Sequence, residues 1–187
     1  MAHKFAELTF TRTVKRVQEE MGSRSDYLPH ESGPERNKLL RDRERSFIEA
    51  RDSFYVASVS ETGWPYIQHR GGPAGFLKVM DPSTIGFADY SGNRQYVTTG
   101  NVLANDRVAL FLMDYPNRRR LKLLGHMALA GPEQLSILEQ LHDHDYGAVI
   151  ERGMIIRVEA FDWNCPQHIT PRYTLLESEA LCASREP

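Results

Sequence analysis

Cysteine is scarce in this chain, with only Cys165 and Cys182 among 187 residues. Two cysteines cannot make the disulfide framework of a small secreted domain, so we expect a cytoplasmic protein in a reducing compartment. The sequence also lacks an apolar run long enough to span a membrane, and its first residues lack the apolar segment of a signal peptide. These absences predict a chain without a membrane partner.

Excess charge of one sign is missing as well. The formal net charge is −2 and the isoelectric point about 6.4. No overall positive field is therefore available to attract nucleic acid or an anionic membrane. Residues 118–122 nevertheless form one basic strand, so a barrel that binds nucleic acid is an alternative function. The neighbours of this strand are leucine and glycine instead of the aromatic residues that stack on single-stranded bases, so we expect no nucleic-acid partner.

Several catalytic and metal-binding signatures are absent. The sequence contains no GxxxxGK[ST] phosphate loop, no GxGxxG dinucleotide fingerprint and no GxSxG elbow. Cys165 lacks a CxxC companion, and His126 and His168 have no partner at zinc spacing. Residues 142–145, His-Asp-His-Asp, end a helical pattern in which residues two apart point to different faces. The sequence therefore predicts no metal site.

Composition and hydrophobic periodicity divide the chain into an N-terminal arm or helix at 1–41, a main domain at 42–175 and a loosely structured tail at 176–187. We expect the arm to lie over the core or over a partner subunit. From Ser53 onward, period-two alternation predicts six or seven strands joined mostly by short connections, which favours antiparallel pairing. Helices are expected at 11–21, 39–51, about 93–104 and 132–145.

Three segments carry candidate binding residues. Strand alternation places Arg118, Arg120 and Lys122 on one face, where they could read an anion or form a solvated edge. Residues 89–96 end a strand before a helix, so exposed amides and Arg94 could hold a phosphate, although an ordinary capped turn explains them equally. In the third segment, 68–79, Arg70 precedes Gly71 and Gly72, which form either a simple bulge or a bare backbone against a planar ligand.

Three collinear segments resemble the FMN-binding split-barrel proteins of the pyridoxamine 5′-phosphate oxidase-like superfamily: IQHRGGPAGFLKV, GFADYSGNRQYVTTGNVLANDRVALFLMDYPNRRRLKLLG and FDWNCPQHITPR. The similarity runs from about Phe47 to Arg172. The resemblance implies a mainly β fold with peripheral helices, a six-stranded antiparallel Greek-key split barrel. It also implies a homodimer with two FMN sites at the subunit interface.

The resemblance assigns the cofactor-binding residues by position. It places Arg70 on the strand that contacts the flavin, beside Gly71 and Gly72. Asn93 and Arg94 fall in the phosphate loop, followed by Gln95. On the basic strand, Arg120 and Lys122 match side chains that reach the flavin, often from the partner subunit, and Arg119 adjoins them. Trp163 and Arg172 fall near the flavin and substrate of the true oxidases, although for Trp163 packing in the core is the simpler interpretation.

Departures from the oxidase pattern argue against pyridoxamine phosphate as substrate. Gly75 stands where the oxidases have a lysine, and Arg120 where they have a glutamine. The C-terminal Arg-x-His signature is absent. No catalytic residue is identified, because His69, His168 and Tyr96 are each explained by structural roles. We expect an FMN-dependent oxidoreductase acting on an unidentified small molecule. The alternative is a non-catalytic carrier or sensor of flavin, haem or the deazaflavin F420.

Overall fold

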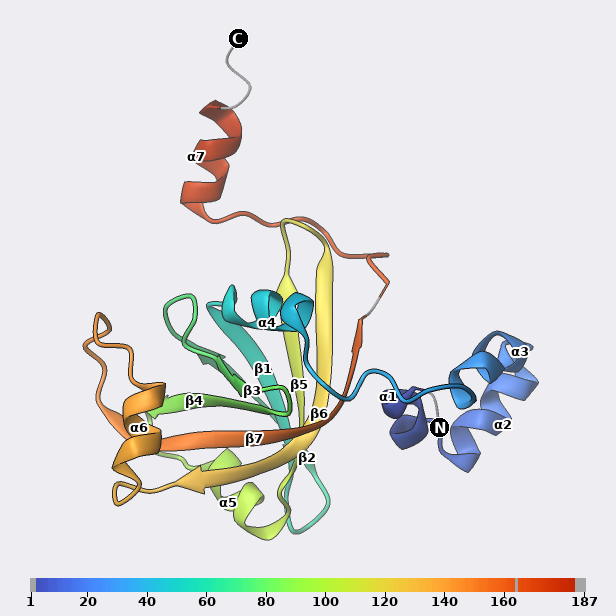
Figure 1. The fold of residues 1–187 in the computed structure, drawn as a ribbon, viewed down its shortest axis with the longest axis horizontal. Coiled ribbons are helices and arrows are strands. Elements are labelled where there is room, and N and C mark those ends of the chain that lie inside the picture. Colours follow the sequence, from blue (N-terminus) through green and yellow to red (C-terminus); the bar gives the residue numbers. More distant parts are fainter. Residues whose placement is uncertain (1–2, 164, 184–187) are drawn as a thin grey trace.

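A single antiparallel sheet of seven strands forms the centre of the computed structural model, which describes residues 3–163 and 165–183 (Figure 1). The strand order is β2-β1-β5-β6-β7-β4-β3. Seven strands agree with the six or seven predicted from periodicity, and the six implied by the resemblance are one too few. The strands are β1 (Ser53–Val59), β2 (Pro65–Gly71), β3 (Lys78–Asp81), β4 (Thr84–Tyr90), β5 (Arg107–Asp114), β6 (Arg119–Ala130) and β7 (Ile150–Trp163).

Strict alternation of burial explains why these segments form strands. In β1 and β5 every second side chain is buried, including Val56 and Leu110, and these two residues face each other in the register. Phe54, Phe76 and Phe87 pack together at centroid distances of 5.2 to 6.5 Å. Apolar side chains on one face of β1, β5 and β6 thus supply the core, as period-two patterning requires, whereas β4 is buried on both faces.

Two long strands curl the sheet. β6 and β7 bend as they run from the end of the sheet near α4 toward the end near α6 (Figure 1). Their pairing register shifts between Leu124 and Gly125, where a bulge lets the strands turn. The curl brings β2 near β4, although five strand positions separate them in the sheet order, and Arg70 on β2 forms an ion pair with Asp89 on β4.

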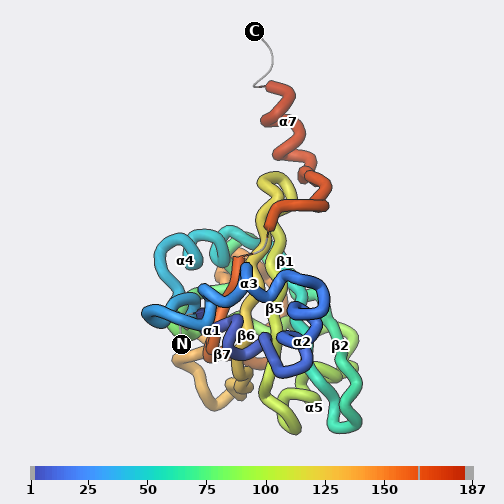
Figure 2. Tube along the Cα trace, turned by 90° about the vertical axis from the view of Figure 1, so that its right-hand side faces the viewer, coloured from blue at the N-terminus to red at the C-terminus, as the bar shows by residue number. Residues whose placement is uncertain are grey.

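The N-terminal arm consists of short helices beside the sheet. Its elements are α1 (Lys4–Thr9), α2 (Arg12–Glu20), α3 (Arg24–Tyr27) and the 3₁₀ helix η1 (Leu28–Glu31). α2 agrees with the helix expected at 11–21, and its apolar residues Val14, Val17 and Met21 are exposed. α1 lies against the sheet, whereas α2 and α3 project from it (Figures 1 and 2).

The described residues contain four further helices: α4 (Asp42–Glu49), α5 (Val97–Ala104) and α6 (Leu135–Leu141) beside the sheet, and α7 (Leu175–Ala183). α4 buries Phe47 and Ile48 against the core. α6 is shorter than the 132–145 helix expected from the sequence and ends before His142. The tail, expected to be loosely structured, contains α7, which extends away from the sheet (Figure 2). Within the described residues, no helix is long and apolar enough to span a bilayer.

Candidate functional site

A recess lies where the end of β4, the 91–96 loop, the start of α5 and the inner face of β2 meet. Its volume is about 60 Å³, far below the roughly 300–1,000 Å³ of a pocket that encloses a drug-sized ligand. A recess of this size in one chain could enclose only part of a cofactor-sized molecule. The lining residues are Tyr66, Gln68, Arg70, Asp89, Tyr90, Gly92, Asn93, Arg94, Gln95, Tyr96, Val97, Thr98, Thr99 and Glu151.

Asp89 is the buried centre of the charges at this recess. Arg70 Nη1 donates to Asp89 Oδ1 at 2.7 Å, and Arg152 Nε lies 3.4 Å from Asp89 Oδ2. Arg152 Nη2 also pairs with Glu151 Oε2 at 2.6 Å. Arg152 is not among the lining residues, but together with Arg70 and Arg94 it gives this cluster three guanidinium groups against the two carboxylates of Asp89 and Glu151, an excess of one positive charge.

Two of these arginines keep a donor without an acceptor. The Nε atoms of Arg70 and Arg152 are buried, and neither makes a hydrogen bond among the residues that the structure describes. For Arg152, the 3.4 Å approach to Asp89 is close enough for an ion pair but does not have hydrogen-bond geometry. A buried unpaired donor is costly. Arg70 lines the recess and Arg152 does not, so an anion placed there would supply an acceptor for Arg70.

The loop that precedes α5 has an unusual backbone. Arg94 and Tyr96 have φ values of 58° and 52°, in the left-handed region that is uncommon for non-glycine residues. Asn93 Oδ1 accepts from the Gln95 amide at 3.2 Å, and Arg94 Nε donates to Tyr96 Oη at 3.1 Å. The expected helix start near Asn93 is wrong: α5 begins at Val97, because the left-handed residues interrupt the helical path. Such backbone strain concentrates at functional sites.

The pKa values at the recess follow from burial and hydrogen bonding. Burial raises the pKa of Asp89, with Arg70 and Arg152 acting in the opposite direction. Burial also raises the pKa of Tyr90, whose hydroxyl is enclosed without a hydrogen bond within the described part of the chain. A hydrogen bond from the Ser91 side chain lowers the pKa of Glu151.

The raised pKa of Asp89 predicts a pH-dependent stability. In the folded chain Asp89 keeps its proton at pH values where the unfolded chain, with an ordinary pKa of 3.8, has lost it. This contribution to the free energy of unfolding is therefore complete below pH 3.8 and declines as the pH rises through the raised pKa. In Asp89→Asn the decline should be absent. Urea midpoints of both proteins, measured from acid to neutral pH, would contradict this if the two profiles ran parallel.

Gly71 and Gly72 are not among the residues that line the recess. Gly71 ends β2 opposite Ser53, and the Gly72 amide donates to the Asp52 carbonyl at 2.9 Å. A Cβ at Gly72 would lie 2.8 Å from the Phe76 ring. The glycine therefore makes room for a core phenylalanine, and a flavin contact by this pair stays a prediction.

The basic strand is separated from the recess. β1 and β5 lie between β2 and β6, which corresponds to about 14 Å along the sheet at the usual strand spacing. Lys122 and Arg120 point away from the core, as alternation predicts, whereas Arg70 points inward. Lys122 Nζ pairs with Asp162 at 3.3 Å and lies 4.7 Å from the Phe5 ring of α1. One chain does not bring the two predicted parts of the flavin site together.

Arg120 and Arg119 have different surroundings on this strand. Arg120 Nε is buried and has no hydrogen-bond partner among the described residues. Arg119 instead lies over two aromatic rings, at 5.3 Å from Phe47 and 5.1 Å from Trp163. Arg120 is thus a third guanidinium with an available buried donor, and it lies on the outer face of the sheet.

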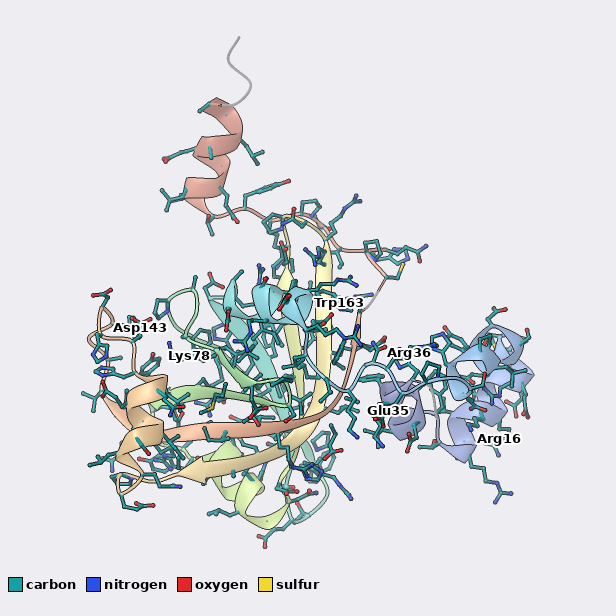
Figure 3. All side chains as sticks on the ribbon, in the orientation of Figure 1. Arg16, Glu35, Arg36, Lys78, Asp143 and Trp163 are labelled. Atoms are coloured by element: carbon teal, nitrogen blue, oxygen red, sulfur yellow. The ribbon has the colours of Figure 1, made fainter. Side chains whose placement is uncertain are left out.

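Trp163 ends β7 beside α4 (Figure 3). Its Nε1 donates to Glu44 Oε1 at 2.8 Å, and its ring meets Phe47 edge-on at 4.8 Å. Arg43 covers the ring at 4.3 Å. These contacts favour the packing interpretation of Trp163. Arg172 lies over the Tyr115 ring at 4.9 Å, close to the hairpin between β5 and β6.

Tyr96 is the one weak catalytic candidate that lines the recess, where Arg152 stacks on its ring at 4.8 Å. His69 points outward from β2 and meets Tyr55 at 5.6 Å, and His168 is exposed after the last strand. Neither histidine is among the residues that line the recess.

Sequence reasoning missed Asp89, Arg152 and Glu151 as site residues. Glu151 and Arg152 are adjacent charged residues at the start of β7, directly before the apolar run Met154–Ile156, a signal that could have identified that end of the strand. Gln68 and Arg70 alternate on β2 and therefore share its inner face. The pairing of Arg70 with Asp89 could not be foreseen, because it depends on the curl of the sheet.

Comparison with known proteins gives a family match. Residues 40–161 match the family model described as "Pyridoxamine 5'-phosphate oxidase". No curated protein sequence matches the chain. A putative pyridoxamine 5′-phosphate oxidase from Lactobacillus delbrueckii is 18% identical, covers 68% of this chain and 95% of its own, and superimposes with a TM-score of 0.51. HupZ from Group A Streptococcus is 14% identical, covers 72% of this chain and 100% of its own, and gives a TM-score of 0.52. These structures share the fold.

Proposed function

Because the chain belongs to the pyridoxamine 5′-phosphate oxidase family, we propose that it is a flavoprotein that binds FMN at the recess. We further propose that it works as an oxidoreductase on a small molecule, in a homodimer whose curled sheets close as split barrels. The ion pair between Arg70 and Asp89, which joins strands distant in the sheet order, supports the closed arrangement.

The buried Nε donor of Arg70, which lines the recess and has no hydrogen-bond partner among the described residues, carries the assignment of the phosphate position, and Arg152 adds positive charge behind it at Asp89. A phosphate oxygen is the acceptor that guanidinium groups bind best, and each charge-assisted hydrogen bond contributes about 1.5–3 kcal/mol. Arg94, fixed beside them by the left-handed backbone of its loop, adds a third cation. The residues present therefore fit a phosphate-bearing cofactor.

The remainder of the flavin would need residues that one chain keeps apart. When bound, FMN supplies hydride transfer through its isoalloxazine ring. The recess of about 60 Å³ holds only part of such a molecule. Arg120, whose Nε has no partner among the described residues, lies on the outer face of β6, where a guanidinium offered to a second subunit would stabilise negative charge on the ring, and Lys122 on the same face is already paired with Asp162. This division of the site supports a dimer with two shared flavin sites.

The outer face of the first strands has the character of a subunit interface. Ile67 on β2 is 65% exposed, and it lies opposite Ala57 on β1. Tyr55, 39% exposed, lies opposite Phe111 on β5. Apolar side chains in adjacent registers form a continuous patch, which soluble monomers rarely expose at large size. A second copy of the chain would bury it.

Gly75 supports a substrate other than pyridoxamine phosphate. It stands at the position of the oxidases' lysine in the sequence comparison and has a φ of 91°. A side chain there would be strained, whatever space surrounds it. The chain therefore cannot present a lysine at this point without changing its backbone.

Spectroscopy of the purified protein tests the cofactor. We expect flavin absorption near about 370 and 450 nm, which is the colour of the cofactor itself. Denaturation should release a small molecule whose mass is that of FMN. Sedimentation should give twice the 21.4 kDa chain mass. A colourless protein that takes up no added FMN would overturn the proposal. Release of F420, or a Soret band, would replace FMN by those cofactors.

Reduction kinetics separate an enzyme from a carrier. If the protein is an oxidoreductase, NADH, NADPH or reduced F420 should reduce its bound flavin in stopped-flow mixing, at a rate fast enough for enzymatic turnover. A bound flavin that none of these donors reduces, even with candidate acceptors present, would favour the non-catalytic carrier.

A further inference from the structure

The turn that follows α6 brings two histidines and a glutamate together. α6 ends at Leu141, and His142 is extended, with φ of −65° and ψ of 136°. The expectation that the His-Asp-His-Asp segment continues a helix is therefore wrong, and so is the conclusion that its two histidines face apart. Figure 3 places this turn at Asp143, at the opposite end of the sheet from the N-terminal helices.

The three side chains converge at their metal-ligating atoms. One such atom each from Glu139, His142 and His144 lies within 4.8 Å of the other two. Glu139 Oε1 is 3.3 Å from His144 Nε2, and the two imidazole rings are 4.3 Å apart at an interplanar angle of 53°. Tetrahedral zinc with bonds of about 2.0–2.1 Å holds its ligand atoms roughly 3.4 Å apart. Small side-chain rotations are enough to reach that spacing.

We propose that Glu139, His142 and His144 bind a zinc-class divalent transition-metal ion. Two imidazoles and one carboxylate suit zinc, whereas magnesium and calcium require oxygen ligands. Glu139 and His144 are exposed, so a fourth position is open to water. The ion would be exchangeable and located outside the flavin site.

The ion would connect a fixed helix to a loop beside the recess. Leu141 is fully buried and anchors α6 against Gly86 and Gly153, where a Cβ would approach it to 2.8 and 2.9 Å. Glu139 stands on this anchored helix, whereas His144 belongs to the following loop.

That loop contacts the end of β4. Tyr146 packs edge-on against Tyr90 at 5.1 Å, and the Val149 carbonyl accepts from the Ser91 amide at 2.8 Å. Tyr90 lines the recess. Metal binding would therefore hold residues 142–149 in place at the rim of the recess, and the same contacts would be looser without the ion.

Metal titration of tag-free protein, stripped of ions with a chelator, tests the site. Zinc affinity is measured by competition with a chromophoric chelator, and ligand geometry by the visible spectrum of bound Co²⁺. Removing a residue that only supports a metal ligand lowers metal affinity about 10–100-fold. The variants His144→Ala and His142→Ala remove a ligand itself, so each should weaken zinc binding about a hundredfold. Glu139→Gln should weaken it less. His126→Ala is the matched control and should bind as the wild type does.

Hydrogen exchange gives the second readout. Zinc should slow exchange in residues 142–149 of the wild type and leave His144→Ala unchanged. Wild-type zinc affinity weaker than millimolar, or equal losses in His126→Ala and His144→Ala, would overturn the site. Binding without slower exchange would overturn the stabilisation of the loop. Neither readout requires flavin, so the result is independent of the proposed cofactor.

Discussion

Replacing Arg70 with methionine should weaken FMN binding about a hundredfold, because a charge-assisted hydrogen bond of about 1.5–3 kcal/mol is lost together with a full positive charge. Methionine keeps much of the length of the side chain and its apolar packing but supplies no donor. Arg70 is suited to this role because it faces inward, lines the recess and keeps a buried Nε donor unpaired within the described chain. Fluorescence quenching of added FMN measures the dissociation constant.

Two further variants separate the loss of a phosphate contact from damage to the fold. Arg70→Met also removes the partner of Asp89 at 2.7 Å, so its unfolding midpoint must be measured beside its affinity. Arg94→Met changes an exposed residue whose side chain bonds to Tyr96, and it should weaken FMN binding with little effect on stability. Arg107→Met, on an exposed position at the start of β5, is the control. Wild-type affinity in Arg70→Met would contradict the phosphate assignment.

Substituting alanine for Gly125 should destabilise the protein by about 3 kcal/mol, at the upper end of the 1–3 kcal/mol typical of overpacking. A Cβ at this position would lie 2.5 Å from the Arg157 carbonyl oxygen and 2.9 Å from Ile156 Cγ2. The nearest atom belongs to the backbone of β7, so neither strand can yield by rotating a side chain. Since Gly125 sits at the shift in register that bends β6, the curl of the sheet would change with it.

A second glycine provides the comparison. Gly100 lies in α5, and a Cβ there would have no atom within 4 Å. Gly100→Ala should therefore stabilise the protein by about 0.5–1 kcal/mol, as expected for an exposed helix position. Urea unfolding of both variants gives the two free energies. A Gly125→Ala protein as stable as the wild type would show that the bulge tolerates a side chain.

Local sequence patterns were sufficient to predict those elements whose structure depends on interactions within a few residues. Alternation at residues 53–59 and 107–114 predicted β1 and β5, because a strand with one buried face needs an apolar side chain at every second position. The loop containing Asn93, Arg94 and Gln95 was also identified, and all three line the recess. The start of α5 was placed too early, since left-handed backbone at Arg94 and Tyr96 leaves no mark in apolar periodicity.

The histidines near α6 show how one boundary changes an interpretation. Periodicity extended the helix to Asp145, and in a helix residues two apart diverge. The helix instead ends at Leu141, which packs against Gly86 and Gly153 from two different strands. No pattern within residues 132–145 reports the presence of those glycines.

The sequence by itself determined the mainly β class, most of the strands and the positions of the cationic segments, because these depend on side-chain periodicity within a few residues. The tertiary structure decided which charges meet. Arg70 reaches Asp89 only because β6 and β7 bend at a bulge, whereas strand alternation places Arg120 and Lys122 on the outer face. Contacts between residues far apart in sequence depend on the curvature of the whole sheet, which no single segment encodes.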